Sequence, residues 1–400
     1  MSVDMSELKA HAPLADYVRK FYPNIPINVN SKGTAYIKCL WHDEDTPSLA
    51  LFKDGKCKCF GCGFSGDIVD IVQKLENMTW KEACEMIGNN VGYEVKFEPP
   101  NPVHEAYKDN LDNHTRRYWV NLQQDTEALQ YLMNIRRISP DMINLFRLGL
   151  TDRDEFKFRS DMGNISRRIV FPILEHKENT PKCVGMAYRG FPEDIKPKYI
   201  NDHNQDGRDG QDPALAGVFI RGNMLYGLPQ AMQGIRRMNH VIIVEGYFDV
   251  ISMHQSGFVN TVATMGTNLT VNHAEEIKKR TGNVILMLDN DTAGKKAILH
   301  DLPILYQAGL NVAICVPETH DPDDWCKQYD FNFQRMHQLI EFKTKQAIDY
   351  VSDLLTERYQ AVATAERYKA MENAEPILNS ITNESTKALM RAMLLKRLDL

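Results

Sequence analysis

The sequence contains no run of about 18 apolar residues, the length that a membrane-spanning helix needs. The opening residues lack the basic and apolar stretches of a secretion signal. The phosphate-binding pattern G-x-x-x-x-G-K-[ST] is missing, which excludes a P-loop ATPase or helicase. Positive charge is not in excess, because 47 basic residues stand against 53 acidic ones, a net charge of -6. That balance argues against a protein that simply coats nucleic acid, but it is compatible with a local basic patch beside an acidic metal site.

Cysteine is scarce outside one short stretch. Four of the eight cysteines stand singly along the chain, at Cys84, Cys183, Cys315 and Cys326. Such spacing is typical of cytosolic proteins and does not predict a disulfide framework, so we expect a cytoplasmic protein. The other four cysteines crowd between positions 39 and 62 and need a local explanation.

Three of the crowded cysteines form two close ligand pairs with one histidine. Cys39-x-x-His42 and Cys59-x-x-Cys62 are separated by 16 residues, enough for a β-hairpin with a tight turn at each pair. Two such pairs are what a tetrahedral zinc ribbon requires. We expect Cys57, two residues before Cys59, on the opposite face of its strand and outside the ligand set. The sequence therefore predicts one structural zinc ion, bound by Cys39, His42, Cys59 and Cys62.

Changes in composition divide the chain into several regions. The proline-rich polar stretch that begins near Pro99 predicts a linker after an N-terminal zinc domain. The region that follows has helical patterns and then short apolar runs between Gly, Pro and Asn, which favour strands. Its segment 156–200 has nine Lys or Arg against five Asp or Glu, a local basic excess. The predicted boundaries are 1–98 for the zinc domain, 99–115 for the linker, 116–235 for the basic region, 236–332 for an α/β domain and 333–400 for a helical segment.

Four apolar runs in the α/β domain, VIIV, TVAT, VILML and VAICV, alternate with helical patterns. The alternation predicts βαβ units and a parallel sheet, so the fold class is a multidomain α/β protein. Acidic residues follow three of these runs. Because the carboxyl ends of parallel strands share one edge of a sheet, we expect the acids to lie together. They are Glu245, Asp289, Asp291, Asp321 and Asp323.

Carboxylates gathered at one edge repel one another and raise each other's pKa unless cations neutralise them. Ligand sets made only of oxygen favour Mg²⁺ or Mn²⁺. A pair of such ions stabilises the attacking and leaving oxygens of phosphoryl transfer. The sequence therefore predicts two or more catalytic Mg²⁺ or Mn²⁺ ions at this edge.

These motifs resemble those of a known family. The series VIIVEGYFDV, MGTN, LDNDTAG and DPDD resembles the Toprim domain of bacterial and phage DNA primases. CLWHDEDTPSLAL followed by CKCFGCGFSGDIVDIV resembles their zinc domain, and RRIVFPI, GMAYRG, PKYIN and RGNMLYGL resemble the segment between the two. The resemblance covers about residues 30–400. It implies a DNA-directed RNA polymerase that makes short RNA primers on single-stranded DNA for replication, by metal-dependent nucleotidyl transfer.

The resemblance also implies roles for individual residues. The catalytic, metal-binding acids of the family match Glu245, Asp289, Asp291, Asp321 and Asp323. The positions that contact nucleotide and template match Arg136, Arg168, Arg189, Lys198, Asn201 and Arg221. The zinc domain is expected to present aromatic and basic side chains to the template: Trp41, Phe60, Phe64, Lys53, Lys56 and Lys58. Expected partners are single-stranded DNA, ribonucleoside triphosphates and a separate replicative helicase of the primosome, with no membrane.

Some positions depart from the family pattern. Thr292 stands where a basic residue often follows the second Asp, His320 where an acid often precedes the last Asp-Pro-Asp, and Arg221 where Lys is common. These differences concern substrate contacts rather than the activity. His273, in VNHAEEI, is expected to be structural. The sequence holds no counterpart of the helicase-binding domain found in many cellular primases, which suggests a phage protein in a host cytoplasm or a shortened chain.

Other interpretations of the same motifs lead to different functions. Topoisomerases and gyrases have a third acid two residues after the second Asp, where this chain has Ala293. A non-catalytic DNA-binding scaffold would not need all five acids. A Toprim nuclease is disfavoured by the zinc ribbon and by the polymerase-like segment. Incubation with single-stranded DNA and ribonucleotides distinguishes a primase from a nuclease, because a primase makes short RNA and a nuclease shortens the DNA.

Overall fold

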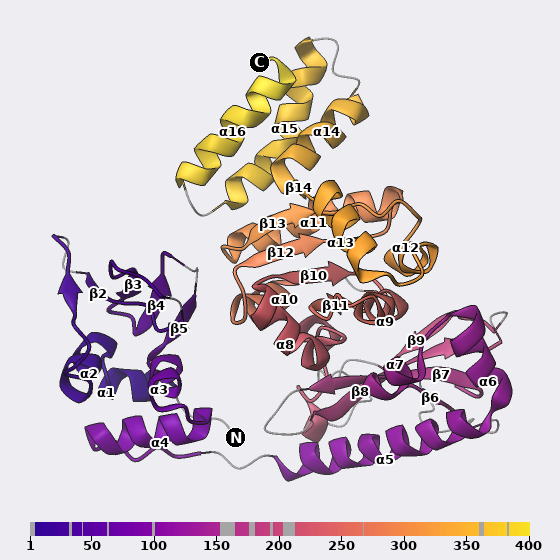
Figure 1. The fold of residues 1–400 in the computed structure, drawn as a ribbon, viewed down its shortest axis with the longest axis horizontal. Coiled ribbons are helices and arrows are strands. Elements are labelled where there is room, and N and C mark those ends of the chain that lie inside the picture. The colour runs from indigo at the N-terminus through magenta and orange to yellow at the C-terminus, as the bar shows by residue number, and fades with distance from the viewer. Residues whose placement is uncertain are drawn as a thin grey trace. The chain divides into compact units, whose positions relative to one another are not determined.

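Two units with separate apolar cores make up the chain in the computed structural model, Met1–Asn101 and Pro102–Leu400. Figure 1 traces both units and their elements. The structure describes residues 5–31, 34–41, 43–61, 64–97, 101–152, 165–175, 181–192, 195–202, 213–266, 268–359, 364–381 and 384–400.

The first unit is built on a short antiparallel sheet with strand order β1-β2-β3-β4-β5. Alternation along β4 turns its two lysines to solvent and its two cysteines to the core. Asp67 ends the sheet and caps the next helix, because its side chain accepts from the backbone N–H groups of Val69 and Asp70. The elements are α1 (Met5–His11), α2 (Leu14–Phe21), β1 (Asn28–Val29), β2 (Ala35–Ile37), β3 (Leu49–Leu51), β4 (Lys56–Cys59), β5 (Ser65–Asp67), α3 (Ile68–Glu76) and α4 (Trp80–Val91).

Helix α5 (Pro102–Gln124) corrects the expected linker at 99–115, because most of that stretch is helical. The sequence concealed this helix because two of its inward positions are polar. Lys108 and Thr115 are buried on the same face as Leu111, Tyr118 and Leu122, and the buried Lys108 forms an ion pair with Glu175 at 2.9 Å. A count of apolar residues alone misses the helical period on this face.

The second unit continues with a four-stranded antiparallel sheet in the order β6-β7-β8-β9. Its long strands β7 and β8 are buried over almost their whole length. A helix begins after Ser139, which caps it, with Pro140 in its first turn. The elements are α6 (Thr126–Gln130), the π-helical turn η1 (Tyr131–Ile135), α7 (Pro140–Leu145), β6 (Gly149–Leu150), β7 (Arg168–Glu175), β8 (Lys182–Gly190), β9 (Tyr199–Asn201), η2 (Pro213–Leu215) and η3 (Arg221–Asn223).

The four apolar runs of the α/β domain form the predicted parallel sheet, in the order β11-β10-β12-β13, with a short antiparallel strand β14 at the edge. Crossover helices connect the parallel strands, so every carboxyl end points to the same edge. The elements are α8 (Leu228–Met238), β10 (Val241–Val244), α9 (Tyr247–Gln255), β11 (Thr261–Ala263), α10 (Val271–Lys278), β12 (Asn283–Leu286), α11 (Thr292–Gln307), β13 (Asn311–Ile314) and α12 (Pro322–Gln328).

Among its described residues, the end of the chain is mostly helical, as predicted, with the short strand β14 (Lys345–Gln346) between two of its helices. Its helices are α13 (Phe333–Lys343), α14 (Ala347–Tyr359), α15 (Thr364–Ser380) and α16 (Glu384–Leu398). The last three share an apolar core with α11 and the parallel sheet, whereas Met336 and Ile340 of α13 belong to a different apolar core of the second unit. None of the helices within the described ranges is both long and apolar enough to cross a membrane.

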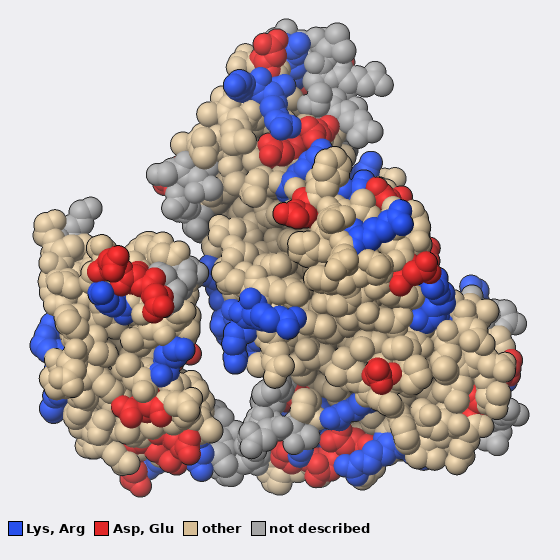
Figure 2. All heavy atoms as spheres, in the orientation of Figure 1, with Lys and Arg blue, Asp and Glu red and all other residues tan. Residues whose placement is uncertain are grey.

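Charge on the face drawn in Figure 2 is mixed, with Lys and Arg gathered over α8 and α10. The last turns of these two helices carry Arg236, Arg237 and Lys278. Basic side chains at helix C-termini complement the negative end of the helix dipole. This concentration of positive charge therefore has a local structural explanation.

A buried histidine on α9 predicts how stability depends on pH. Burial lowers the pKa of His254 from 6.5 to about 4, and its Nε2 donates to the carbonyl oxygen of Thr261 at 2.9 Å. Between these two values the unfolded chain binds more protons than the folded one, so stability falls as the pH falls. We expect this group to remove on the order of 3 kcal/mol of unfolding free energy across that window.

Urea unfolding of the wild type and of His254→Gln at pH 7 and at pH 4.5 measures this effect. The glutamine retains an N–H donor for Thr261 but does not titrate, so the variant should lose less stability on acidification than the wild type. Equal losses for the two proteins would contradict the prediction.

Candidate active site

The acidic residues lie where the sequence predicted them, at the carboxyl edge of the parallel sheet. Glu245 follows β10 directly, and Asp289 follows β12 after two apolar residues. Asp321 follows β13 and caps α12, where its side chain accepts from the N–H of Asp324 at 2.7 Å. The three segments meet because β12 pairs in parallel with both β10 and β13.

A glycine brings the segment after β12 into position. A Cβ on Gly294 would lie 2.1 Å from the carbonyl oxygen of Asp289, so no other residue fits there without moving the backbone. The N–H of Gly294 also donates to the side chain of Asp291 at 2.8 Å, which caps α11. The turn in LDNDTAG is therefore fixed by Asp291 and Gly294 together, and it places Asp289 at the edge of the sheet.

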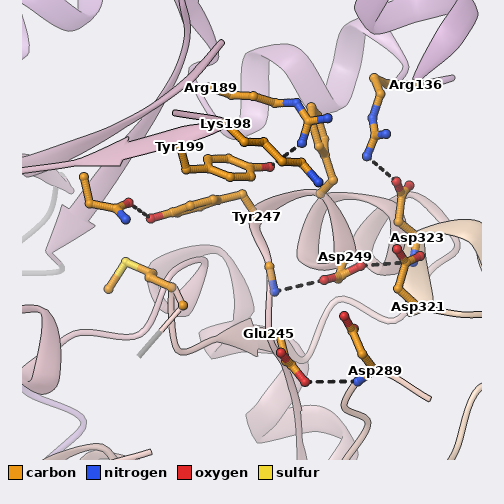
Figure 3. Close-up of a pocket in the computed structure, with 15 residues that line it drawn as sticks. Arg136, Arg189, Lys198, Tyr199, Glu245, Tyr247, Asp249, Asp289, Asp321 and Asp323 are labelled. Atoms are coloured by element: carbon orange, nitrogen blue, oxygen red, sulfur yellow. Dashed lines mark hydrogen bonds and ion pairs between the residues drawn. The ribbon is translucent and has the colours of Figure 1, made fainter. Parts of the chain in front are cut away.

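A cavity of about 270 Å³ opens at this edge. Figure 3 shows acids on one side of it and Arg189, Lys198 and Tyr199 on the other. Eight of the residues predicted for the site line the cavity: Arg136, Arg189, Lys198, Asn201, Glu245, Asp289, Asp321 and Asp323. Segments from both sheets of the second unit therefore contribute to one site.

The acids of the cavity raise each other's pKa. Burial, with the charges of Glu245 and Asp321 adding to it, raises the pKa of Asp289 to about 7. Burial also raises the pKa of Glu245, with a contribution from Asp291, and the pKa of Asp321, with contributions from Asp324 and Asp323. The environment of these three acids therefore disfavours their negatively charged forms.

The oxygens of this cluster fit a cation. Asp289 Oδ1 is buried and has no hydrogen-bond partner among the described residues. The backbone N–H of Asp289 donates to Glu245 Oε1 at 3.1 Å, which holds the Glu245 carboxylate beside the backbone of Asp289. Single oxygens of Asp321, Asp323 and Asp324 lie within 4.8 Å of one another, close enough to share one ion. A hard divalent ion would satisfy these oxygens and remove the repulsion.

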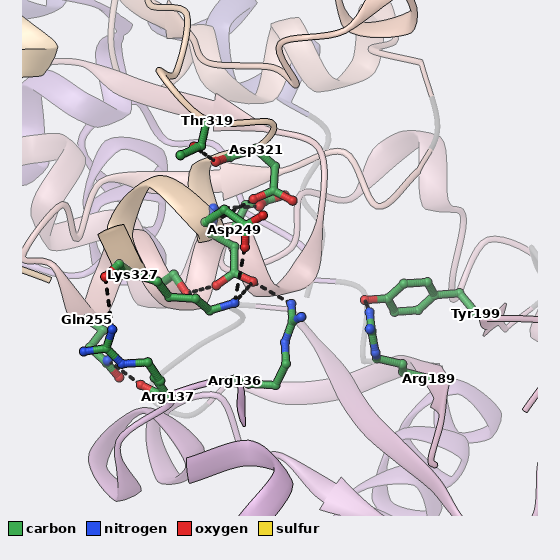
Figure 4. A network of polar contacts seen from close by, with 12 residues as sticks. Arg136, Arg137, Arg189, Tyr199, Asp249, Gln255, Thr319, Asp321 and Lys327 are labelled. Carbon is green, nitrogen blue, oxygen red and sulfur yellow. Dashed lines mark hydrogen bonds and ion pairs between the residues drawn. The ribbon is translucent and has the colours of Figure 1, made fainter. Parts of the chain in front are cut away.

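Asp323 differs from the other acids because the protein already neutralises it. Arg136 Nη2 lies 2.5 Å from its Oδ2, Lys327 Nζ lies 2.7 Å from the same oxygen, and the hydroxyl of Ser252 donates to its Oδ1 at 2.6 Å. Figure 4 shows Arg136 and Lys327 converging on this point. Arg136 directly follows the π-helical turn η1, so Asp323 connects this turn to the edge of the parallel sheet.

The opposite wall combines positive charge with aromatic rings. The guanidinium of Arg136 stacks 4.1 Å from the ring centre of Phe248, and that of Arg189 lies 5.2 Å from the same centre. Arg189 also donates to the hydroxyl of Tyr199 at 2.8 Å. Fixed guanidinium groups on aromatic faces suit phosphate and base recognition. Lys198 is exposed and free to reach a ligand in the cavity.

Three predicted residues are not among the described residues that line the cavity: Asp291, Arg168 and Arg221. Asp291 caps α11, although its charge acts on Glu245. Arg168 is buried, and its guanidinium donates to the backbone carbonyls of Pro197 at 2.9 Å and Lys196 at 3.4 Å. Arg221 is half-buried in η3, beside the N-terminus of α10.

The sequence analysis missed an acid of the cavity, Asp249. Its carboxylate accepts from the N–H of Gly246 at 2.9 Å and from the N–H of Asp323 at 3.2 Å, so it connects two acidic segments. Burial, together with the charges of Asp321 and Asp323, raises its pKa well above the ordinary value. The sequence VEGYFD contained a signal for this role. Asp249 is the third residue of α9, and an acid at that position often accepts a hydrogen bond from the backbone N–H of the cap residue, here Gly246. Tyr199 and Tyr247, which also line the cavity, carried no signal of this kind.

The zinc ribbon of the first unit is described in part, because His42 and Cys62 lie outside the described residues. The expected hairpin is present, with β3 and β4 antiparallel and Leu49 opposite Cys59. The N–H of Trp41 donates to Cys39 Sγ at 3.4 Å, and the N–H of Gly61 donates to Cys59 Sγ at 3.3 Å. Such N–H donors stabilise thiolates, so both cysteines fit a metal ion.

The expectation that Cys57 lies on the opposite face of its strand was wrong, whereas its exclusion from the zinc ligands stays a prediction. Residues two apart in a strand lie on the same face, and Cys57 and Cys59 are both buried on the same side of β4. Burial, with the charges of Asp70 and Asp67 adding to it, raises the pKa of Cys57 to about 12. Its environment therefore favours the neutral thiol, which is a poor zinc ligand.

The side chains expected to meet the template divide into two groups. Phe60 is 62% exposed, and Lys53, Lys56 and Lys58 are exposed on the same hairpin. Trp41 and Phe64 are half-buried and stack on each other, with ring centres 3.5 Å apart. Phe60 and the lysines are therefore accessible, whereas the Trp41–Phe64 pair contributes a packed surface.

Comparison with known proteins agrees with this architecture. A family model described as Toprim-like matches residues 242–326, and a CHC2 zinc finger model matches residues 3–101. These matches imply zinc in the first unit and a divalent metal ion in the second. The predicted fold class, a multidomain α/β protein with a zinc ribbon and a Toprim domain, is confirmed.

Relatives and solved structures cover most of the chain. A DNA primase of Aquifex aeolicus is 30% identical over 355 residues, which cover 82% of this chain and 67% of that protein. A DNA primase of Staphylococcus epidermidis is 28% identical over 399 residues, which cover 86% of this chain and 62% of that protein. The chain thus spans about two thirds of the length of these relatives.

Among solved structures, the zinc-binding and RNA polymerase domains of the Aquifex aeolicus primase match with a TM-score of 0.60 and 25% identity, covering 100% of this chain and 98% of that one. A DnaG primase catalytic domain bound to ssDNA matches in fold, with a TM-score of 0.61 and 23% identity, covering 74% of this chain and 96% of that one. On the identity and coverage of the Aquifex aeolicus relative, this chain belongs to the bacterial DNA primase family.

Proposed function

We propose that the chain is a DNA primase that synthesises short RNA primers on single-stranded DNA, using ribonucleoside triphosphates. The observation that carries the proposal is the cavity with an acidic wall and a basic, aromatic wall, in a chain that also has a zinc ribbon. Nucleotidyl transfer needs both walls, because the triphosphate and the template backbone are anionic and the catalytic ions are cationic.

Glu245, Asp289 and Asp321 form the centre of the proposed metal site, with Asp291 and Asp323 at its margins. Mg²⁺ or Mn²⁺ bound there would neutralise the carboxylates and polarise the reacting phosphate. Asp249 holds the backbone of the acidic segments, and its two backbone contacts keep Gly246 and Asp323 in place. Asp323 anchors Arg136 and Lys327, so its contribution is shared between the metal site and the basic wall.

Arg136, Arg189, Lys198 and Asn201 are the proposed contacts for nucleotide and template. Arg168 acts on them indirectly, because its two bonds to the carbonyls of Lys196 and Pro197 hold the segment that carries Lys198. The hydroxyl of Tyr247 donates to Asn201 Oδ1 at 2.6 Å, which fixes the amide at the cavity wall. These contacts prepare the basic wall before substrate arrives, so binding requires little rearrangement.

The zinc domain is proposed to select the start site on the template. A structural zinc ion held by Cys39, His42, Cys59 and Cys62 would stabilise this small domain. Its exposed Phe60 and neighbouring lysines suit single-stranded DNA, where bases stack on aromatic rings and phosphates meet positive charge. We further propose a cytoplasmic location and a separate replicative helicase as a partner, both from membership in the family.

The deciding experiment incubates the full chain with single-stranded DNA, labelled ribonucleoside triphosphates and Mg²⁺. Labelled RNA that is resistant to DNase and sensitive to RNase supports the proposal. Shortened DNA without RNA identifies a nuclease instead. A parallel reaction with Mn²⁺ identifies which ion supports synthesis.

Replacing Asp289 by Asn should abolish primer synthesis and leave the fold intact. The change removes one charge from a repulsive cluster, so the unfolding midpoint without divalent ions should stay equal or rise slightly. Activity should fall by a hundredfold or more, on the order expected when a catalytic ion is lost. Glu275→Gln is the matched control, because Glu275 is exposed on α10. An Asp289→Asn enzyme with near wild-type synthesis would refute the assignment.

A chain of residues 102–400 should separate the two roles. It begins at α5 and retains every apolar cluster of the second unit, so it should fold without the zinc domain. It should extend a pre-annealed RNA primer and should lose initiation at preferred template sites. Paired assays on one preparation measure both steps. Equal initiation by the shortened and full-length proteins would show that the zinc domain does not select the start site.

A further inference from the structure

His273 was expected to be structural, but its contacts connect it to a predicted substrate residue. Its ring is fully buried at the start of α10. The N–H of Thr270 donates to Nδ1 at 3.2 Å, which leaves the proton on Nε2, and Nε2 donates to the carbonyl oxygen of Arg221 at 3.0 Å. Burial lowers the pKa of His273, and the neutral ring fits both contacts.

Two neighbours of His273 hold the same segment. The hydroxyl of Thr270 donates to the carbonyl oxygen of Gly222, and Asn272 Nδ2 donates to Asn223 Oδ1 at 2.7 Å. A Cβ on Gly222 would lie 3.3 Å from the methyl group of Thr270, so the two segments are already in close contact. Side chains from 270–273 therefore bond all three residues of η3, the short turn that presents Arg221.

The turn η3 lies next to a wall of the cavity. Tyr247 lines the cavity, and its ring centre lies 4.9 Å from that of Tyr226, three residues beyond η3. Burial raises the pKa of Tyr247, and the positive charge of Arg221 acts against that rise. Just after η3, Tyr226 exchanges two backbone hydrogen bonds with Ala263 of β11, at 2.9 and 3.0 Å. The turn is thus held by residues 270–273 at the start of α10, and the chain just after it is bonded to the parallel sheet.

We propose that Thr270 and His273 are positioning residues that hold η3 so that Arg221 reaches the phosphate groups of a bound nucleotide. The inference rests on the proposed function, because it takes a ribonucleoside triphosphate as the ligand. Neither residue touches the nucleotide, and both act through Arg221. Without these bonds the turn would have to be ordered during binding, which weakens affinity and leaves the chemical step largely unchanged.

The test compares two threonine variants in primer extension with varied ribonucleoside triphosphate. Thr270→Val removes the hydroxyl that holds Gly222. Thr281→Val is the matched control, because the hydroxyl of Thr281 donates to the carbonyl of Asn239 at 2.9 Å. These two residues precede strands β12 and β10, at the amino edge of the sheet. We expect Thr270→Val to raise the KM for nucleotide about tenfold, with kcat within about twofold of wild type, and the control to change neither. A wild-type KM for Thr270→Val, or the same rise in the control, overturns the proposal.

A double variant tests whether the effect passes through Arg221. Arg221→Ala should raise KM by itself, and adding Thr270→Val should raise it no further than about twofold. Multiplied effects, or an unchanged KM in Arg221→Ala, overturn the proposal. His273→Gln provides a second route if Thr270→Val unfolds at the assay temperature. It keeps Thr270, whose hydroxyl caps α10 by accepting from the N–H of residue 273, and it removes the ring that holds Arg221.

The result also separates this proposal from the proposed function. Wild-type RNA synthesis with an unaffected Thr270→Val enzyme leaves the primase assignment standing and removes the positioning role. Absence of RNA synthesis by the wild type rejects both.

Discussion

Mutual repulsion among partly buried carboxylates at one edge of a parallel sheet is the constraint on which the rest of the site depends. Asp289, Glu245, Asp249 and Asp321 all have raised pKa values, because burial and neighbouring acids disfavour their charged forms. A fold that only needed stability would not gather them. Backbone N–H groups hold Asp249 and Glu245 in place, and two cations neutralise a neighbouring acid, Asp323.

The acidic edge and the basic wall come from different sheets, and a few contacts join them. Arg136 reaches Asp323 across the cavity, and its guanidinium packs on Phe248 of α9. Arg168 and the segment 270–273 each fix the backbone of a residue that carries positive charge. Side chains without direct access to the cavity therefore determine where the charged groups lie. A mutation at such a position should weaken substrate binding more than it slows the chemical step.

Much of the site was predictable from the sequence because parallel strands share a carboxyl edge. The runs VIIV, VILML and VAICV placed their acids at one edge, and family motifs identified three basic residues of the cavity, Arg136, Arg189 and Lys198. The predictions failed where side chains perform unusual roles. Buried Lys108 and Thr115 concealed the helical period of α5. The face of Cys57 was wrongly predicted, because residues two apart in a strand lie on the same face and not on opposite faces. The side chain of Arg168 is buried because its guanidinium bonds the carbonyls of residues 196–197. These contacts are between residues far apart in the sequence, so no local pattern predicts them.

The central claim is that the acidic cluster is unfavourable until a divalent cation binds it. The most direct measurement is the thermal unfolding midpoint of the full chain at pH 8, with and without 10 mM Mg²⁺ (a test concentration of the order that weak sites need), for wild type and Asp289→Asn. Binding to the folded state alone should raise the wild-type midpoint by several degrees, since ligand at about a hundred times its Kd contributes about 2.7 kcal/mol. The variant should show little or no rise. A wild-type midpoint that does not respond to Mg²⁺, or an equal rise in both proteins, would contradict the account.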